Sequence, residues 1–316
     1  MQLLIEHNGN LIEPPIEEGV VWTTSRVGTP SSLSFNMKTD EATVIEEGSA
    51  IRLTDGTDNL FFGFLFKSKE SKKDVIPISA YDQLRYLKNK DSYNFIGQTA
   101  SEIIRKIASD FVLNVGEIED TIYKIPSLKK QDASLFDIIQ SALDITLMNT
   151  KSLFVLYDDF GKLTLKNIKN TQINIEVDED CCEDYEYDKD IDSDTYNQIK
   201  LIEENKDSKS RKVYIAKDTS KINKWGLLQM YEKLGEKENG QVKADAMLKL
   251  KNRVLKKLSI KNCIGDNRVR AGVRLLVNIK TKSTTINSIM LVDKAKHTYK
   301  KDQHMMDINL RSGEYE

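Results

Sequence analysis

The sequence predicts an α+β protein of several domains, in which two β-rich parts flank a part with both helices and strands. Short apolar runs between turn residues fill the first 80 residues, segments with helical spacing follow, and alternating runs return near the C-terminus. A chain of 316 residues holds two or three domains at about 150 residues each. We place them at residues 1–80, 81–170 and 171–316, the last with a helical insertion at about 220–260.

The first part contains five apolar runs that predict strands: Val20–Thr24, Ser32–Met37, Ala50–Asp55, Leu60–Phe66 and Asp74–Ser79. In the second run Leu33, Phe35 and Met37 alternate with polar residues, as in a half-buried strand. Glycine-containing turn signals, such as Asp55-Gly56, separate the runs. Five strands at this spacing predict a small sheet or a barrel-like domain.

The middle part begins with a helix signal. Thr99 and Glu102 form a capping box, because each side chain can bind a backbone N–H of the other at a helix start. A second amphipathic helix is predicted from about Ser134 to Leu147. Strands at 153–157 and 162–167 then flank a turn that contains Gly161, which predicts a hairpin.

The last part is more varied. Residues 176–194 carry 11 Asp and Glu against Lys189 alone, which predicts a linker or a solvated sheet edge. The runs that follow predict strands at Asn197–Ile202 and Lys212–Ala216, helix from Trp225 to Tyr231 with a stop at Gly235, a longer helix at about Gln241–Leu258, and strands from Gly272 to Leu310.

Composition excludes several classes of protein. The chain is 39% apolar with 5 prolines, so collagen-like and proline-rich disordered proteins are excluded. The longest apolar cluster, Leu60–Phe66, is too short to span a bilayer, and the N-terminus lacks a secretory pattern, so we expect no membrane partner. Three cysteines, two of them adjacent, do not make a disulfide framework and indicate a reducing compartment.

Charge is distributed unevenly, although the net charge is only −2. Residues 1–200 carry 35 Asp and Glu against 21 Lys and Arg, a net charge of −14, whereas residues 201–316 carry a net charge of +12. This asymmetry favours contacts between unlike parts of one chain or of neighbouring copies. The basic stretch at 243–261 lacks aromatic residues on its basic face, so a solvated or partner-facing helix is a simpler interpretation than specific nucleic-acid binding.

The sequence contains no recognisable catalytic, cofactor or metal motif. It has no G-x-S-x-G elbow and no Walker loop. His297 and His304 flank a predicted turn and could share a metal with a third ligand such as Cys263, but ordinary strand histidines explain them as well. Aspartates recur at every second position from Asp188 to Asp194, as at the start of an EF-hand calcium loop. Such a loop needs Gly at its sixth position and Glu at its twelfth, but this chain has Ser193 and Ile199 there. We therefore expect a protein that is not an enzyme and has no cofactor.

Several short motifs, taken in order, resemble the baseplate hub proteins of contractile phage tails and phage-tail-like particles, of the XkdQ/YqbQ type. The motifs are Trp22, Gly28-Thr29-Pro30, Leu33-Ser34-Phe35, Phe62-Gly63, Ala80–Leu87, Gly161–Leu165, Trp225–Gln229, Gly265–Gly272, His297-Thr298-Tyr299 and His304-Met305-Met306. The resemblance implies a homotrimeric ring between the six-fold tail tube and the three-fold central spike, with two tube-like β domains in each subunit. It also implies the tube protein, the spike protein and other baseplate proteins, including a LysM-type protein, as partners in a particle assembled in the bacterial cytoplasm.

A head-to-tail ring needs two different complementary surfaces, which the unlike charges of the two halves could supply. Candidate interface residues are Trp22, Phe61, Phe64, Trp225, Arg268 and Arg270, although burial in the core is the simpler interpretation for each apolar one. Tyr81–Arg85 is interpreted as a domain junction with an ion pair or a polar cap. The competing hypotheses are a tail-associated peptidoglycan hydrolase and a nucleic-acid-binding protein of the same particle.

Overall fold

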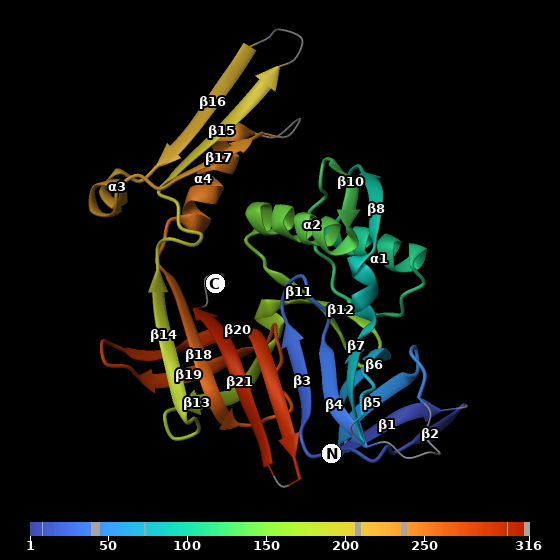
Figure 1. Cartoon of the computed structure of the whole chain (residues 1–316). Coiled ribbons are helices and arrows are strands. Elements are labelled where there is room, and N and C mark those ends of the chain that lie inside the picture. The colour runs from blue at the N-terminus through green and yellow to red at the C-terminus, as the bar shows by residue number, and fades with distance from the viewer. Residues whose placement is uncertain are drawn as a thin grey trace.

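One sheet of 13 strands crosses both β-rich parts of the chain (Figure 1). The computed structural model describes residues 1–7, 9–38, 45–72, 74–205, 210–234, 239–301 and 303–312. Strands hold 52% of the chain and helices 19%, so the protein is mostly β. Among the helices of these ranges, none is long and apolar enough to cross a membrane.

Seven strands form the N-terminal half of this sheet: β1 (Gln2–His7), β2 (Asn10–Ile12), β3 (Val20–Ser25), β4 (Ser32–Lys38), β5 (Ala50–Asp55), β6 (Asp58–Ser68) and β7 (Val75–Tyr81). All five predicted strands are present, and β1 and β2 are additional. Leu33, Phe35 and Met37 are buried while their polar neighbours are exposed, so the predicted alternation is confirmed. Their side chains pack with those of β1, β3, β5 and β6 in one hydrophobic core.

The C-terminal half of the sheet is built from β13 (Gln172–Asp178), β14 (Asp184–Asp190), β18 (Leu255–Ile264), β19 (Arg274–Lys280), β20 (Thr285–Lys300) and β21 (Gln303–Ser312). Within this half β14 pairs with β18, β18 with β21 and β21 with β20, all antiparallel. The acidic stretch is thus largely an edge strand, in agreement with the predicted solvated edge rather than a linker.

The two halves are joined by β3 and β20, whose antiparallel register runs from Val20–Tyr299 to Ser25–Lys294. We expected two barrel-like domains, and this expectation is not confirmed, because no ring of strands closes within the described residues. The 16-residue β20 serves both halves: its first part pairs with β19 and its last part with β3. Local alternation predicts strands, but it does not show that one long strand joins the two halves of a single sheet.

The middle part packs above the N-terminal strands and contains α1 (Ala100–Asp110), α2 (Leu135–Thr150), β8 (Lys90–Phe95), β9 (Val115–Ile118), β10 (Leu128–Ser134), β11 (Phe154–Asp158), β12 (Leu163–Asn167) and the short helices η1 (Gln83–Lys88) and η2 (Ile168–Asn170) (Figure 1). The capping box of Thr99 and Glu102 is present at α1. Both predicted helices and the predicted hairpin are confirmed, with Ser134 as the N-cap of α2.

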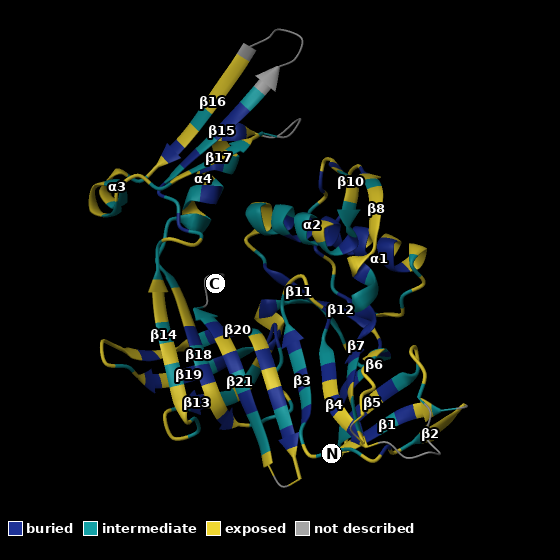
Figure 2. Ribbon diagram, in the orientation of Figure 1, coloured by how far each residue is buried: buried dark blue, intermediate teal, exposed yellow. Residues whose placement is uncertain are grey.

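An arm projects from the C-terminal half and consists of β15 (Gln198–Asn205), β16 (Ser210–Lys217), α3 (Thr219–Trp225), β17 (Gln229–Lys233) and α4 (Gly240–Lys251) (Figures 1 and 2). Two helix predictions are wrong here. Residues 229–233 form a strand because they pair with β15, and the longer helix ends at Lys251 because residues 255–264 pair with β14 and β21. The proposed stop at Gly235 lies outside the described residues.

Candidate functional site: the junction of the three parts

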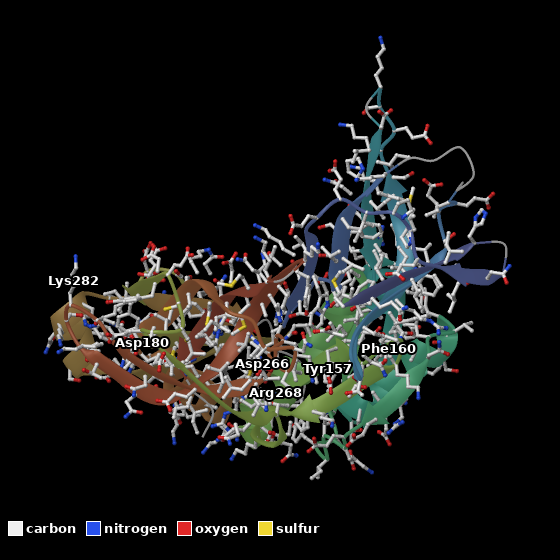
Figure 3. The ribbon with its side chains drawn as sticks, turned by 90° about the horizontal axis from the view of Figure 1, so that it is seen from below. Tyr157, Phe160, Asp180, Asp266, Arg268 and Lys282 are labelled. Carbon is white, nitrogen blue, oxygen red and sulfur yellow. The ribbon has the colours of Figure 1, made fainter. Side chains whose placement is uncertain are left out.

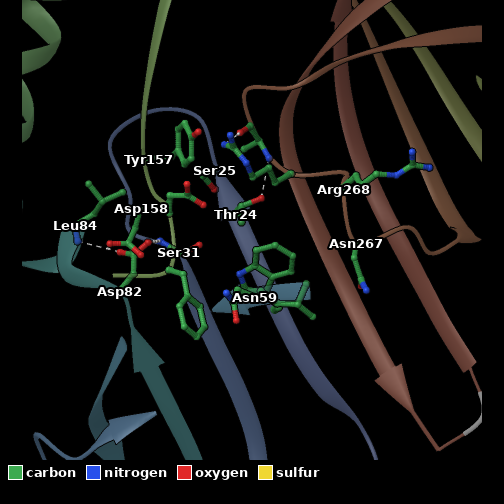
Figure 4. Close-up of a pocket in the computed structure, with 16 residues that line it drawn as sticks. Thr24, Ser25, Ser31, Asn59, Asp82, Leu84, Tyr157, Asp158, Asn267 and Arg268 are labelled. Atoms are coloured by element: carbon green, nitrogen blue, oxygen red, sulfur yellow. Dashed lines mark hydrogen bonds between the residues drawn. The ribbon is translucent and has the colours of Figure 1, made fainter. Parts of the chain in front are cut away.

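A small cavity of about 140 Å³ lies where the N-terminal strands, the middle part and the C-terminal half meet (Figure 4). Its walls come from β3, from the start of η1, from the turn after β11 and from the loop between β18 and β19. Figure 3 shows the molecule from below and labels Tyr157, Phe160 and Arg268, which line this cavity. We treat this junction as the candidate functional site because it fixes the relative positions of the three parts.

Asp82 is the most deeply buried carboxyl group of the junction, with 1% of its surface exposed. The backbone N–H of Leu84 donates to Asp82 Oδ1 and that of Ser31 to Asp82 Oδ2, both over 3.0 Å. Asp82 is therefore the N-cap of η1 and also holds the loop before β4. The predicted polar cap at Tyr81–Arg85 is confirmed. Burial, and then the nearby charge of Asp158, raise the Asp82 pKa well above its usual value.

A second carboxyl group, that of Asp158, closes the turn after β11. Gln83 Nε2 donates to Asp158 Oδ2 over 2.7 Å, and the backbone N–H of Gly161 donates to Asp158 Oδ1 over 2.6 Å. Gln83 also exchanges two hydrogen bonds with the backbone of Asn114. Burial raises the pKa of Asp158 to about 6 despite these hydrogen bonds.

The raised pKa of Asp158 predicts a pH-dependent stability. The folded protein retains this proton up to a pH of about 6, whereas an unfolded chain releases it near pH 3.9. Stability supplied by the protonated group is therefore lost as the pH rises through this interval, by about 3 kcal/mol. Chemical denaturation should show that wild type loses more stability between pH 4 and pH 7 than Asp158→Asn does. Parallel curves for the two proteins would contradict this assignment.

Arg270 connects the C-terminal half with the middle part. Its guanidinium carbon lies 3.3 Å from the centre of the Tyr157 ring on β11. Burial lowers the pKa of Arg270 from its usual value. A desolvated cation above an aromatic face is strongly favoured, so the pair holds the two parts together.

Replacing Arg270 by methionine keeps an unbranched side chain and removes the guanidinium group with its charge. We expect the free energy of unfolding to fall by about 1–2 kcal/mol, since a desolvated cation–π contact is lost. Urea denaturation measures the change, and Arg268→Met is the matched control. Arg268 is exposed and pairs with Asp266, so its replacement should change stability by less than about 1 kcal/mol. Equal effects of the two substitutions would contradict the role of Arg270.

The loop between β18 and β19 is held against the N-terminal strands by its own polar groups. Asn267 Nδ2 donates to Asp55 Oδ2 over 3.0 Å and to Asp58 Oδ2 over 3.1 Å, and the hydroxyl of Tyr299 donates to Asn267 Oδ1. The backbone N–H of Ala271 donates to Thr24 Oγ1 over 2.9 Å. This part of the Gly265–Gly272 motif thus docks the C-terminal half onto the N-terminal half.

Trp22 and two histidines form a stack across the β3–β20 link. The ring centres of Trp22 and His297 are 5.0 Å apart. His297 Nε2 donates to the carbonyl of Val269 over 2.7 Å, so its Nδ1 accepts from His304 Nε2 over 2.8 Å. Burial lowers the pKa of His297 to about 4, which keeps the ring neutral near pH 7. The predicted proximity of the two histidines is confirmed, and each of these ring nitrogens has a partner within the protein.

Asp293 stabilises the point where β20 bends from one half to the other. It lies at a register shift in β20, and its backbone carbonyl accepts from the N–H of Arg26. The side chains of Arg26 and Arg311 bind its two carboxylate oxygens, the first over 2.7 Å. No local sequence pattern indicates this joint, because 267 residues separate Arg26 from Asp293.

The six candidate interface residues occupy different environments. Trp22 and Phe61 are buried in the N-terminal core. For these two residues the structure agrees with core burial, the simpler alternative to an interface role. Phe64 is half-buried beside Tyr86 of η1, with ring centres 6.4 Å apart. Trp225 is half-buried at the end of α3, under the ammonium group of Lys221. Arg270 lies inside the junction, and only Arg268 is exposed.

No group of three or more His, Cys, Asp or Glu in the described ranges is arranged to hold a metal ion. The carboxylate of Asp190 accepts from the backbone N–H groups of Asp192 and Ser193, so it closes a turn. Cys263 lies 3.5 Å from Cys181, sulfur to sulfur, and 1% of it is exposed. These contacts account for the local structure without a ligand.

Comparison with known proteins places the chain in a family. The YQBQ-like family model matches residues 20–311. The protein named "Phage-like element PBSX protein XkdQ" of Bacillus subtilis (strain 168) is 31% identical, over 93% of this chain and 92% of that protein.

Two solved structures share the fold. The 43 kDa tail protein of prophage MuSo2 from Shewanella oneidensis is 13% identical with a TM-score of 0.72, over 98% of both chains. The E. coli c3393 protein is 10% identical with a TM-score of 0.55, over 99% of this chain and 77% of that one. That protein is described as a component of the type VI secretion system with structural similarity to the T4 tail proteins gp27 and gp5. These structures show the fold, whereas the family model and the 31% identical relative show that the chain belongs to the YQBQ-like family.

Proposed function

We propose that the chain is a structural hub subunit of a contractile tail or tail-like bacteriocin, which forms a homotrimeric ring around an axial channel. The ring would join the six-fold tail tube to the three-fold central spike. The observation that best supports this role is the β3–β20 link, which fixes two β-rich halves of one chain to each other. Three such chains would present six β-rich halves to the six-fold tube. The ring as a whole would keep the three-fold symmetry of the spike.

The junction supports a rigid part rather than a moving one. Asp82 and Arg270 connect different parts of the chain through contacts that are largely shielded from water, and Asn267 adds a partly exposed hydrogen bond. Groups held in this way resist relative motion of the parts, since breaking any one contact leaves a buried polar or charged group without its partner. A subunit that transmits force between tube and spike requires such rigidity. We place it in the baseplate of the particle, assembled in the bacterial cytoplasm with the tube, the spike and a LysM-type protein as partners.

Deleting the gene from a parent phage or tail-like element tests this role. Tubes and spikes should then fail to join, and a plasmid copy of the wild-type gene should restore complete tails seen by electron microscopy. Tails of normal length that carry a spike in the absence of this chain would contradict the proposal.

One observation favours the alternative, a peptidoglycan hydrolase, because Asp82 and Asp158 are neighbouring carboxyl groups with raised pKa values. Two features speak against it. Both oxygens of Asp82 accept backbone N–H groups, and a cavity of about 140 Å³ is below the roughly 300 Å³ of small-ligand sites. A zymogram with the purified chain decides between them: a zone of cleared cell wall that disappears in Asp82→Asn or Asp158→Asn would favour the hydrolase.

A further inference from the structure

The arm is inserted between two paired strands of the main sheet, β14 and β18, through the short connections 191–197 and 252–254. One face of its sheet is covered by α4, whose Ala244 and Met247 pack on Ile199 and Leu201. The same core includes Met148 of α2, so the covered face is the one turned towards the middle part. The opposite face therefore points away from the rest of the chain (Figure 1).

This outward face exposes apolar side chains. Register places Ile215, Lys200 and Tyr231 in one row across the three strands, and Val213, Ile202 and Lys233 in the next. Val213 is 47%, Ile215 46% and Tyr231 50% exposed on the two outer strands of this sheet, whereas Ile202 on the central strand is 2% exposed. We call these two rows, with Arg211 and Lys217, the arm face.

The arm face is also positively charged. Lys200, Lys217, Lys233 and Arg211 lie on it by strand alternation, and Arg211 donates to the hydroxyl of Tyr231 over 2.7 Å. By the same register Glu204 lies opposite Arg211, so four cations on this face are opposed by one acidic residue. Apolar side chains bordered by cations are suited to a protein surface that is acidic and itself partly apolar.

The chain itself carries an acidic surface on β14. Asp184, Glu186 and Asp188 are exposed on one face of this strand, while Tyr185 and Tyr187 point into the core. β14 pairs only with β18, so its other edge is open in the described part of the sheet. Lys257 and Lys261 lie opposite Asp188 and Asp184, but Ser259 lies opposite Glu186, which leaves that charge without an opposing cation on β18.

We propose that the arm face of one copy binds the acidic face of β14 on a second copy. The inference rests on the proposed ring, because a ring subunit needs two different surfaces that fit each other head to tail. Because the arm face turns away from its own body, a neighbouring copy can reach it.

Charge would steer and orient this contact, and the apolar side chains of the arm face would supply most of its affinity. Self-association of the full chain should therefore weaken as salt increases, but persist in part. Two charge reversals test the pairing: Lys200→Glu with Lys217→Glu on the arm face, and Glu186→Lys with Asp188→Lys on β14. Analytical ultracentrifugation of the full chain at low and high salt, over a wide range of concentrations, measures the dissociation constant.

We expect each double reversal alone to raise the dissociation constant by at least about tenfold. A chain that carries all four substitutions should regain association, because its reversed arm face meets the reversed β14 of the next copy. The matched control, Lys129→Glu with Lys249→Glu, changes the net charge of two exposed sites elsewhere and should behave as wild type. Circular dichroism checks that each variant is folded.

Three results would overturn the inference: a wild-type chain that stays monomeric at every concentration, a control that weakens association equally, or a fourfold variant that is not restored. The proposed hub role is tested separately. A particle in which this chain forms a ring at the tube–spike junction, with its arm faces apart from any neighbouring β14, would keep that role and exclude this contact.

Discussion

Replacing Trp22 by alanine is expected to lower the free energy of unfolding by about 3–5 kcal/mol, the loss typical of truncating a large buried aromatic side chain. Trp22 is 4% exposed, packs in the N-terminal core and stacks on His297 across the β3–β20 link. Its removal opens a cavity where the two halves are joined, so both halves should lose stability together. Urea denaturation followed by circular dichroism measures the change.

Trp22→Phe is the matched control. The indole Nε1 of Trp22 is buried and has no hydrogen-bond partner among the described residues. Phenylalanine keeps an aromatic ring beside His297 and removes this unpaired donor, so the lost contact area is offset by the lost desolvation cost. We expect stability within about 1 kcal/mol of wild type. A Trp22→Phe chain as unstable as Trp22→Ala would mean that the indole N–H, not the packed ring, is essential.

Gly63→Ala should be the most disruptive small substitution in the chain. A Cβ at this position would lie 2.3 Å from the carbonyl oxygen of Tyr81 on β7 and 2.7 Å from its carbonyl carbon. Backbone atoms cannot turn aside as a side chain can, so β6 and β7 must separate locally. We expect a loss of at least about 3 kcal/mol, or failure to fold. This contact explains in physical terms why the Phe62-Gly63 strand carries a glycine.

The control for this substitution is Gly56→Ala. Gly56 has a φ of +57° and open space where its Cβ would stand, so alanine there should cost only the strain of a left-handed conformation, about 1 kcal/mol. Thermal unfolding of both variants separates the two causes. A Gly63→Ala chain no less stable than Gly56→Ala would show that the β6–β7 approach is looser than the structure indicates.

Much of the local structure could be predicted from the sequence, because alternation and capping act over a few residues. The alternation around Met37 predicts a strand, and the capping box of Thr99 and Glu102 predicts a helix start. Each of these signals is contained within a few residues of the chain. Prediction failed for β17 and β18. The apolar residues of 225–231 and the stripe that ends at Leu258 fit helical spacing, but pairing with distant strands decided the outcome.

The junction was predicted only in outline. The polar cap at Tyr81–Arg85 is a local pattern and was found, whereas its neighbour Asp158 is 76 positions away from Asp82 in the chain and carries no signature. Tyr157 and Arg270 are likewise brought together only by the fold. Contacts of this kind depend on how β3 meets β20, which no short segment encodes.

The most direct test of the hub role is a cryo-electron microscopy reconstruction of intact tails that contain this chain. We predict three copies in one ring on the particle axis, between the last layer of the tube and the spike, with both β-rich halves of each copy facing the tube. Finding the chain away from the axis, or in a number other than three at that junction, would contradict the account.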